Sequence, residues 1–266
     1  MRKLYATLSI ALFGAMLSCQ EQDNVSKNEI PNDVISKLQK AGFDTSEGLS
    51  QYRDGYLVEY DIFLTAKQIS DLGAPVSEGV NANEEHYRTY NLVTGAPRTL
   101  AIFMDPGFDN YMQNSFDAAL SRYNALNLNI SFQRTTNESA ADIAILSFYE
   151  NSNVLGYSAG FPSAGGDPAS PISLNTRYYN NSSQRADATT VIAHEIGHAI
   201  GFRHTDYMSR RFSCGRGGNE GSAGVGAVYI PGTPKKGENG SYMLACSDGT
   251  DRPFTSGDRT ALTTVY

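Results

Sequence analysis

The stretch VIAHEIGHAIGFRHTD, residues 191–206, contains three of the four histidines in the chain. Two of them, His194 and His198, are four residues apart, so on a helix they lie on one face and one turn apart. Glu195 follows His194 directly and falls between the two histidines in angle. The spacing therefore predicts a helix that carries two imidazoles and one carboxylate on the same side.

The end of this stretch supplies a third histidine. Gly201 allows the chain to leave the helix in a conformation that other residues resist, and the turn brings His204 round towards the other two. Three imidazoles with a fourth position left open are the usual ligand set of a catalytic zinc ion. The alternatives are a helix with satisfied core histidines, or a site that binds zinc without turnover.

A zinc site of this kind predicts peptide hydrolysis. A zinc-activated water would attack a peptide carbonyl, with Glu195 as general base and then as proton donor to the leaving amine. No covalent intermediate is needed.

The N-terminus has the layout of an export signal. Arg2 and Lys3 precede an apolar run that is too short to span a bilayer, so residues 1–18 are expected to be a signal peptide. The small residue before Cys19 resembles a bacterial lipoprotein cleavage box, which predicts lipidation of Cys19 and a polar tether over residues 19–30. This favours the bacterial outer membrane or cell surface, and otherwise a periplasmic or secreted protein with an ordinary signal peptide.

Composition agrees with an exported protein. The chain has 266 residues, 40% of them hydrophobic, which is enough for one domain with an appendage or for two small domains. Its net charge of −7 gives no reason to expect a nucleic-acid partner. With Cys19 lipidated, Cys214 and Cys246 remain as a pair, and a disulfide between them is predicted over two free thiols.

The pattern divides the chain into two parts. A small N-terminal unit over residues 31–80 has a helix over 31–42, one strand over 56–64 that follows an Asp-Gly turn, and a second helix with a capping box at Thr65 and Gln68. Residues 87–266 form the larger domain. Its order of strands, helices and a Gly-rich stretch over 213–249 predicts an α/β (α+β) lobe followed by a loop-rich lobe, closed by a helix that Ser256 could cap.

The sequence HEIGHAIGFRH resembles the signature of the metzincin zinc peptidases, and together with the ending FTSGDRTALTTVY it is similar to the dual-action HEIGH metallopeptidases. The resemblance implies a two-lobed, metzincin-like domain with a twisted sheet, an active-site helix and zinc bound by His194, His198 and His204. It also implies Glu195 as catalytic base and a Met-turn under the metal, for which Met243 in GSYMLAC is the candidate.

The same resemblance implies that residues 156–166 form the upper rim of the cleft, where edge backbone pairs with an extended substrate; the alternative is a surface loop. Asp167 in GGDP is a candidate calcium ligand, but an Asp-Pro turn is the favoured explanation of this residue. His86 has no partner motif and is expected to be solvated.

The N-terminal unit could be an inhibitory pro-segment or a permanent accessory. It contains no cysteine that could cap a zinc ion, so a switch would need a carboxylate such as Asp54, Asp61 or Glu84. The sequence as a whole predicts a monomeric, exported, lipid-anchored zinc endopeptidase that acts on proteins or peptides. The alternative is a binding protein instead of an enzyme: a cell-surface adhesion or glycan-binding lipoprotein that has a metzincin scaffold but no turnover.

Overall fold

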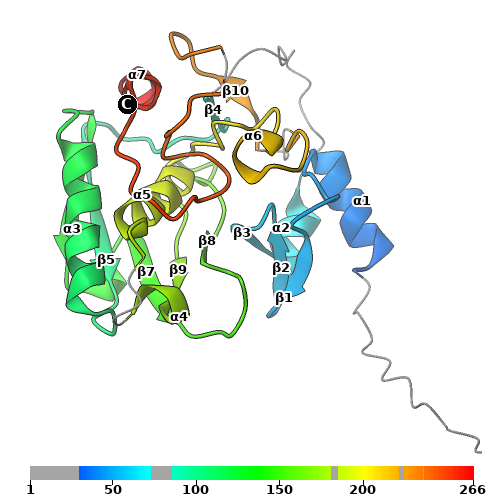
Figure 1. Ribbon diagram of the computed structural model, residues 1–266, viewed down its shortest axis with the longest axis horizontal. Coiled ribbons are helices and arrows are strands. Elements are labelled where there is room, and N and C mark those ends of the chain that lie inside the picture. Colours follow the sequence, from blue (N-terminus) through cyan, green and yellow to red (C-terminus); the bar gives the residue numbers. More distant parts are fainter. Residues whose placement is uncertain (1–29, 73–85, 181–184, 222–224, 236) are drawn as a thin grey trace, which may run out of the picture.

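A computed structural model describes residues 30–72, 86–180, 185–221, 225–235 and 237–266 (Figure 1). The expected signal peptide, Cys19 and Glu84 lie outside these residues. Among the described residues, no helix combines the length and apolar character needed to cross a membrane.

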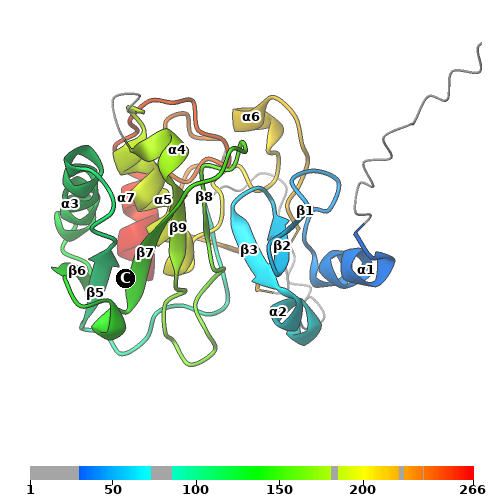
Figure 2. The same cartoon turned by 90° about the horizontal axis from the view of Figure 1, so that it is seen from below.

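One mixed sheet organises the molecule, and its larger half is mostly parallel. In spatial order its strands are β1 (Ser50–Tyr52), β2 (Gly55–Val58), β3 (Ile62–Thr65), β8 (Gly156–Ser158), β9 (Ile172–Asn175), β7 (Ile143–Phe148), β5 (Arg98–Met104) and β6 (Ile130–Thr135). Strand β5 pairs in parallel with β6 and β7, and β7 with β9, whereas β8 runs antiparallel to β9. Figure 2 shows this succession from β6 to β1.

The helices are α1 (Asn32–Ala41), α2 (Ala66–Asp71), α3 (Asn110–Asn124), α4 (Thr176–Tyr179), α5 (Ala188–Ala199), α6 (Arg211–Cys214) and α7 (Ser256–Val265), with a 3₁₀ turn at Glu138–Ala140. Helix α3 begins where the Asp109 side chain accepts the Met112 amide, 3.0 Å away. Its apolar stripe packs against α5 and β6, and this contact is the centre of the main core. Packing in the main core therefore fixes the position of α5, the helix that carries His194 and His198.

The N-terminal unit has a core of its own and also extends the sheet. Leu38 of α1, Ile62 of β3 and Ile69 of α2 are fully or almost fully buried against one another. The predicted capping box at Thr65 is present. Strand β3 pairs in parallel with β8, with Ile62 opposite Ser158, so the unit continues the sheet of the larger domain.

The prediction of one strand over 56–64 is wrong. Strands β2 and β3 form an antiparallel hairpin in which Val58 faces Ile62. The connection is Glu59-Tyr60-Asp61, where Glu59 and Tyr60 have φ angles of 55° and 78°. Neither residue favours this left-handed region, so the sequence carries no turn signal, and contacts with the rest of the protein must hold the turn.

The C-terminal region is irregular, as expected. Its only strand within the described residues, β10 (Val228–Tyr229), pairs with β4 (Tyr87–Arg88) outside the main sheet. Helix α7 is capped by Thr255, one residue before the predicted Ser256. The mixed α/β architecture is confirmed, and the C-terminal part is loop-rich as predicted.

Candidate metal centre

The three histidines of the opening stretch meet at one point. His194 and His198 project from α5, and the chain turns back at Gly201, whose φ is 109°, to place His204 against them. All three are buried, with exposures of 7%, 0% and 0%. The helix end and the third histidine therefore lie where the sequence predicts.

Each imidazole is oriented by a hydrogen bond at its Nδ1 atom. The acceptors are the carbonyl of Tyr242 for His194, at 2.9 Å, and the carbonyl of Phe202 for His198, at 2.9 Å. For His204 the acceptor is a carboxylate oxygen of Glu220, at 2.5 Å. A proton on each Nδ1 leaves the Nε2 lone pair free to bind a metal ion.

The three Nε2 atoms face one another at the spacing of a tetrahedral zinc site. The Nε2 atom of His198 lies 3.0 Å from that of His194 and 3.2 Å from that of His204. Ligands about 2.0–2.1 Å from a tetrahedral ion are about 3.3 Å apart. Three imidazole lone pairs this close repel one another unless a cation lies between them, so the side chains fit zinc.

Their protonation is set by burial and by two carboxylates. Burial lowers the pKa of His194 and, further, that of His198, which keeps both imidazoles neutral. Burial alone would lower the pKa of His204 too, but the charges of Glu220 and Asp61 outweigh it and raise that pKa well above its usual value. The same negative charges favour a metal cation at this position.

Glu195 lies beside the cluster and is 3% exposed. Its Oε2 atom has no hydrogen-bond partner among the described residues. Burial, with a further contribution from the charge of Asp61, raises its pKa well above the usual value, although His204 acts in the opposite direction. A buried carboxylate without a partner needs a polar ligand to satisfy it.

Asp61 adds a fourth metal-binding group that the histidine motif does not contain. Its Oδ2 atom lies 3.0 Å from the Nε2 atom of His204 and 3.7 Å from that of His194. The ligand atoms of Asp61 and the three histidines are all within 4.8 Å of one another. The Asp61 carboxylate therefore lies where the fourth ligand of a tetrahedral ion would bind.

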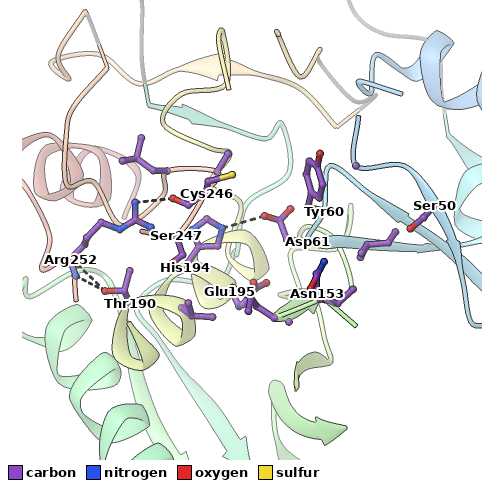
Figure 3. A pocket seen from close by; sticks show the side chains of 18 of the residues that line it. Ser50, Tyr60, Asp61, Asn153, Thr190, His194, Glu195, Cys246, Ser247 and Arg252 are labelled. Atoms are coloured by element: carbon purple, nitrogen blue, oxygen red, sulfur yellow. Dashed lines mark hydrogen bonds and ion pairs between the residues drawn. The ribbon is translucent and has the colours of Figure 1, made fainter. Parts of the chain in front are cut away.

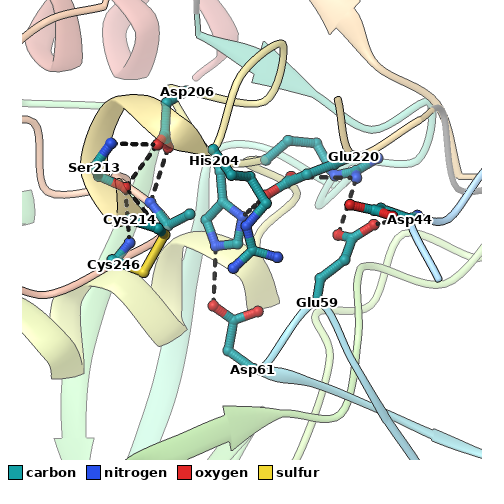
Figure 4. A network of polar contacts seen from close by, with 12 residues as sticks. Asp44, Glu59, Asp61, His204, Asp206, Ser213, Cys214, Glu220 and Cys246 are labelled. Carbon is teal, nitrogen blue, oxygen red and sulfur yellow. Dashed lines mark hydrogen bonds and ion pairs between the residues drawn. A yellow bond between two sulfur atoms is a disulfide. The ribbon is translucent and has the colours of Figure 1, made fainter. Parts of the chain in front are cut away.

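A buried ion network surrounds His204 (Figure 4). Arg203 lies 3.3 Å from a carboxylate oxygen of Glu59 and 3.6 Å from one of Glu220, and Arg210 lies 3.5 Å from Glu220. Burial and the charge of Glu220 raise the pKa of Glu59 to about 8, against the effect of Arg203. The network joins the N-terminal unit, through Glu59, to the segment that carries His204.

The candidate Met-turn residue packs against α5 between its two histidines. A Cβ atom on Gly197 would lie 2.5 Å from the Sδ atom of Met243, so only glycine leaves room there. The Met243 carbonyl accepts the Thr205 amide, 2.8 Å away, and Asp258 binds the neighbouring Ser241 and Tyr242. This turn therefore orients His194 through the Tyr242 carbonyl. It also fixes the backbone next to His204 through the bond from the Thr205 amide.

A cavity of about 520 Å³ opens beside the histidine cluster (Figure 3). One wall is the face of α5 with Thr190, Val191, His194 and Glu195, and a second wall is residues 244–247 with Arg252. The remaining lining comes from the N-terminal unit, through residues such as Tyr60 and Asp61, and from residues 153–156. Cys214 and Cys246 form a disulfide with Cα atoms 5.2 Å apart, which ties the second wall to α6.

The sequence profile of the dual-action HEIGH metallo-peptidases matches residues 56–266. The chain belongs to this family. It is a metallopeptidase, and its three imidazoles and Glu195 fit zinc as the metal. The family match begins inside β2, so it includes Asp61 and β3 of the N-terminal unit.

Two solved structures are distantly similar to this HEIGH metallo-peptidase. A structure of myroilysin has 11% identity and a TM-score of 0.46, and the match covers 68% of this chain and 98% of that one. High choriolytic enzyme 1, a hatching-enzyme zinc protease from the medaka fish Oryzias latipes, has 16% identity and a TM-score of 0.36, with 62% and 88% covered. No curated protein matches the chain.

Several groups of this metallo-peptidase could not be assigned from the motif. Glu220 and Glu59 are isolated acidic residues in the sequence, and only the folded chain places them against His204 and Arg203. The prediction that His86 is solvated is wrong. This side chain is 4% exposed, and its Nε2 atom lies 3.2 Å from a carboxylate oxygen of Glu238. Asp167 pairs with Arg98 at 3.3 Å.

Proposed function

We propose that this metallo-peptidase is a zinc endopeptidase of metzincin type that the N-terminal unit holds inactive. Its metal ligands are His194, His198 and His204, and Glu195 is its general base. One observation supports the activity most directly. Three Nε2 atoms converge at 3.0 and 3.2 Å beside Glu195, whose Oε2 atom has no partner among the described residues, and a cavity with room for a side chain opens next to them.

The site residues divide the hydrolysis between them. Bound zinc would polarise the scissile carbonyl and lower the pKa of the attacking water. Glu195 takes a proton from this water and passes it to the amine as the C–N bond breaks and the C–O bond forms. The products are a carboxylate and an amine. Tyr242, Phe202 and Glu220 hold the three imidazoles in the tautomer that can bind the metal.

The N-terminal unit blocks the place where a substrate backbone would bind. The family resemblance puts an extended substrate alongside β8, but in this structure β3 pairs with that side of β8. The Ser158 amide donates to the carbonyl of Asp61, 2.9 Å away, while the Asp61 side chain extends to His204. Asp61 therefore occupies both the strand edge and the fourth ligand position.

The three residues of the strained turn each contact the catalytic part. Glu59 pairs with Arg203, the ring of Tyr60 lies 4.8 Å under the guanidinium of Arg210, and Asp61 reaches His204. A turn in an unfavourable backbone conformation persists only where its surroundings hold it. Residues 31–80 could be an inhibitory pro-segment or a permanent accessory, and these contacts favour the inhibitory pro-segment.

We also propose that the protein is exported and anchored through a lipid on Cys19. The Cys214–Cys246 disulfide supports export, because structural disulfides persist in oxidising compartments.

Peptide-library hydrolysis tests the activity. The chain from residue 20 onward is incubated with zinc as the wild type, as Asp61→Ala and as Asp61→Ala/Glu195→Ala. Cleavage by Asp61→Ala that disappears in the double variant and with a chelator is the expected result. A folded, zinc-loaded Asp61→Ala protein that cleaves no peptide would contradict the proposal and favour a binding protein.

A further inference from the structure

Arg252 contributes a cationic group to the wall of the cavity beside Glu195. Its backbone amide is 2.6 Å from the hydroxyl of Thr190, which lies one helical turn, about 5–6 Å, before His194 on α5. Among the described residues that line the cavity, Arg252 is the only lysine or arginine. Figure 3 shows its side chain extending from Thr190 towards Cys246.

The guanidinium of Arg252 lacks an adequate partner within the described residues. It is 5% exposed, its Nε atom has no hydrogen-bond partner, and its Nη1 atom makes one long contact, 3.4 Å, with the Cys246 carbonyl. Burial lowers its pKa below the usual value for arginine. A buried cation left in this state gains from any carboxylate that reaches it.

The carboxylates near Arg252 do not fill this role. Four aspartates are close enough to act on its charge, and each accepts hydrogen bonds from another side chain: Asp187 from Arg185, Asp206 from Ser213, Asp248 from Thr250 and Asp258 from Ser241. None forms an ion pair with Arg252. The guanidinium is therefore available to a ligand in the cavity.

The position of Glu195 indicates which substrate residue enters this cavity. In the proposed reaction Glu195 passes a proton to the leaving amine, so the residue that carries this amine, P1′, lies beside Glu195. A P1′ side chain at this position would enter the cavity, which Glu195 and Arg252 both line. Val191, Leu244 and Ala245 give the cavity apolar walls, which cannot pair with a carboxylate.

We propose that Arg252 selects substrates with Asp or Glu directly after the scissile bond. The proposal rests on the endopeptidase function above, because it assigns the specificity of the same site. The substrate class is then acidic peptide segments cut on the amino side of the acidic residue. A charged hydrogen bond made in a cavity shielded from water discriminates more strongly than apolar contact.

The test compares peptides that differ only at P1′, with Glu and the uncharged isostere Gln as the decisive pair and Lys as a third. Wild type and Asp61→Ala are both assayed, so that inhibition by the N-terminal unit does not hide the preference. We expect kcat/KM for the Glu peptide to exceed that for the Gln peptide by about tenfold or more. Arg252→Gln should bring this ratio to about one, and Arg252→Glu should shift the preference to Lys.

Arg122→Gln is the matched control, because Arg122 pairs with Asp251 next to Arg252 but does not line the cavity. It should leave the Glu-to-Gln ratio unchanged. Thermal unfolding and zinc content show whether each variant is folded. If Arg252→Gln does not fold, Arg252→Lys replaces it in the test; this variant keeps the charge and should retain part of the preference for the Glu peptide.

A binding measurement separates this proposal from the activity itself. The same peptides are titrated calorimetrically into Asp61→Ala/Glu195→Ala, which cannot turn over in the proposed mechanism. Tighter binding of the Glu peptide supports the role of Arg252 even if no form cleaves, in which case the proposed function alone fails. The proposed role of Arg252 would be overturned if the Glu and Gln peptides were bound and cleaved equally. It would also be overturned if the preference for the Glu peptide survived in Arg252→Gln.

Discussion

The Asp61 carboxylate lies 3.0 Å from the Nε2 atom of His204, although the two residues are 143 positions apart in the chain. One belongs to the N-terminal hairpin and the other to the turn after α5. Their contact places an acidic group where a tetrahedral ion bound by three histidines would have its fourth ligand. A metal at this site would therefore join the N-terminal unit to the catalytic part.

Zinc should stabilise the wild type more than Asp61→Ala. The wild type binds the ion through four groups and the variant through three, so the rise in melting temperature on adding zinc should be smaller in the variant. Calorimetry with and without zinc measures both rises. Asp54→Ala, which changes an exposed acid of the same unit, is the control and should behave as the wild type. Equal rises in Asp61→Ala and the wild type would show that Asp61 is not a ligand.

Arg203→Met should destabilise the protein by about 3–5 kcal/mol, because it removes the arginine that pairs with the buried Glu59 and leaves the buried Glu220 with Arg210 and His204 alone. Urea denaturation measures the change. Arg216→Met removes a 69% exposed side chain that pairs with Glu47, and it should change stability by less than about 1 kcal/mol. Similar losses in the two variants would argue against a special role for the buried network.

Gly197→Ala should destabilise α5 by about 1–3 kcal/mol, because the new methyl group would overlap the buried Met243 side chain. The shift would also move His194 and His198, so zinc affinity should fall. Gly218→Ala, where a Cβ atom meets nothing within 4 Å, is the control. Unfolding curves and zinc titration measure both effects, and unchanged zinc affinity in Gly197→Ala would refute the packing argument.

The capping box of α2, the helix that carries His194 and His198 and the turn at Gly201 could all be predicted from the sequence. Each depends on residues within one or two helical turns of one another, so their spacing in the chain is also their spacing in space. The histidine cluster was predictable for the same reason.

The hairpin at Glu59-Tyr60-Asp61 was not predictable. Two residues there adopt left-handed backbone that their side chains do not favour, and the turn depends on contacts with Arg203, Arg210 and His204 far along the chain. An alternating apolar pattern continues through the turn, so it indicated one uninterrupted strand. The partners of His204 and the environment of Arg252 were hidden for the same reason, since they are brought together only by folding.

Removing the Cys214–Cys246 disulfide should cost about 3–4 kcal/mol, because the bridge closes a loop of 32 residues in an irregular region. Denaturation of the oxidised protein is compared with that of Cys214→Ala/Cys246→Ala. The cavity wall formed by residues 244–247 should become more open to proteolysis in the variant. A variant as stable as the oxidised protein would show that the loop is held by other contacts.

The most direct test of the account is the rate of peptide hydrolysis by Asp61→Ala, the wild type and Asp54→Ala, each from residue 20 onward and loaded with zinc. If Asp61 blocks the metal centre, Asp61→Ala should cleave faster than the wild type by about tenfold or more, the equivalent of at least 1.4 kcal/mol of released inhibition. Asp54→Ala should stay as slow as the wild type, and adding Glu195→Ala should abolish the gain. A zinc-loaded Asp61→Ala protein no faster than the wild type would contradict the account.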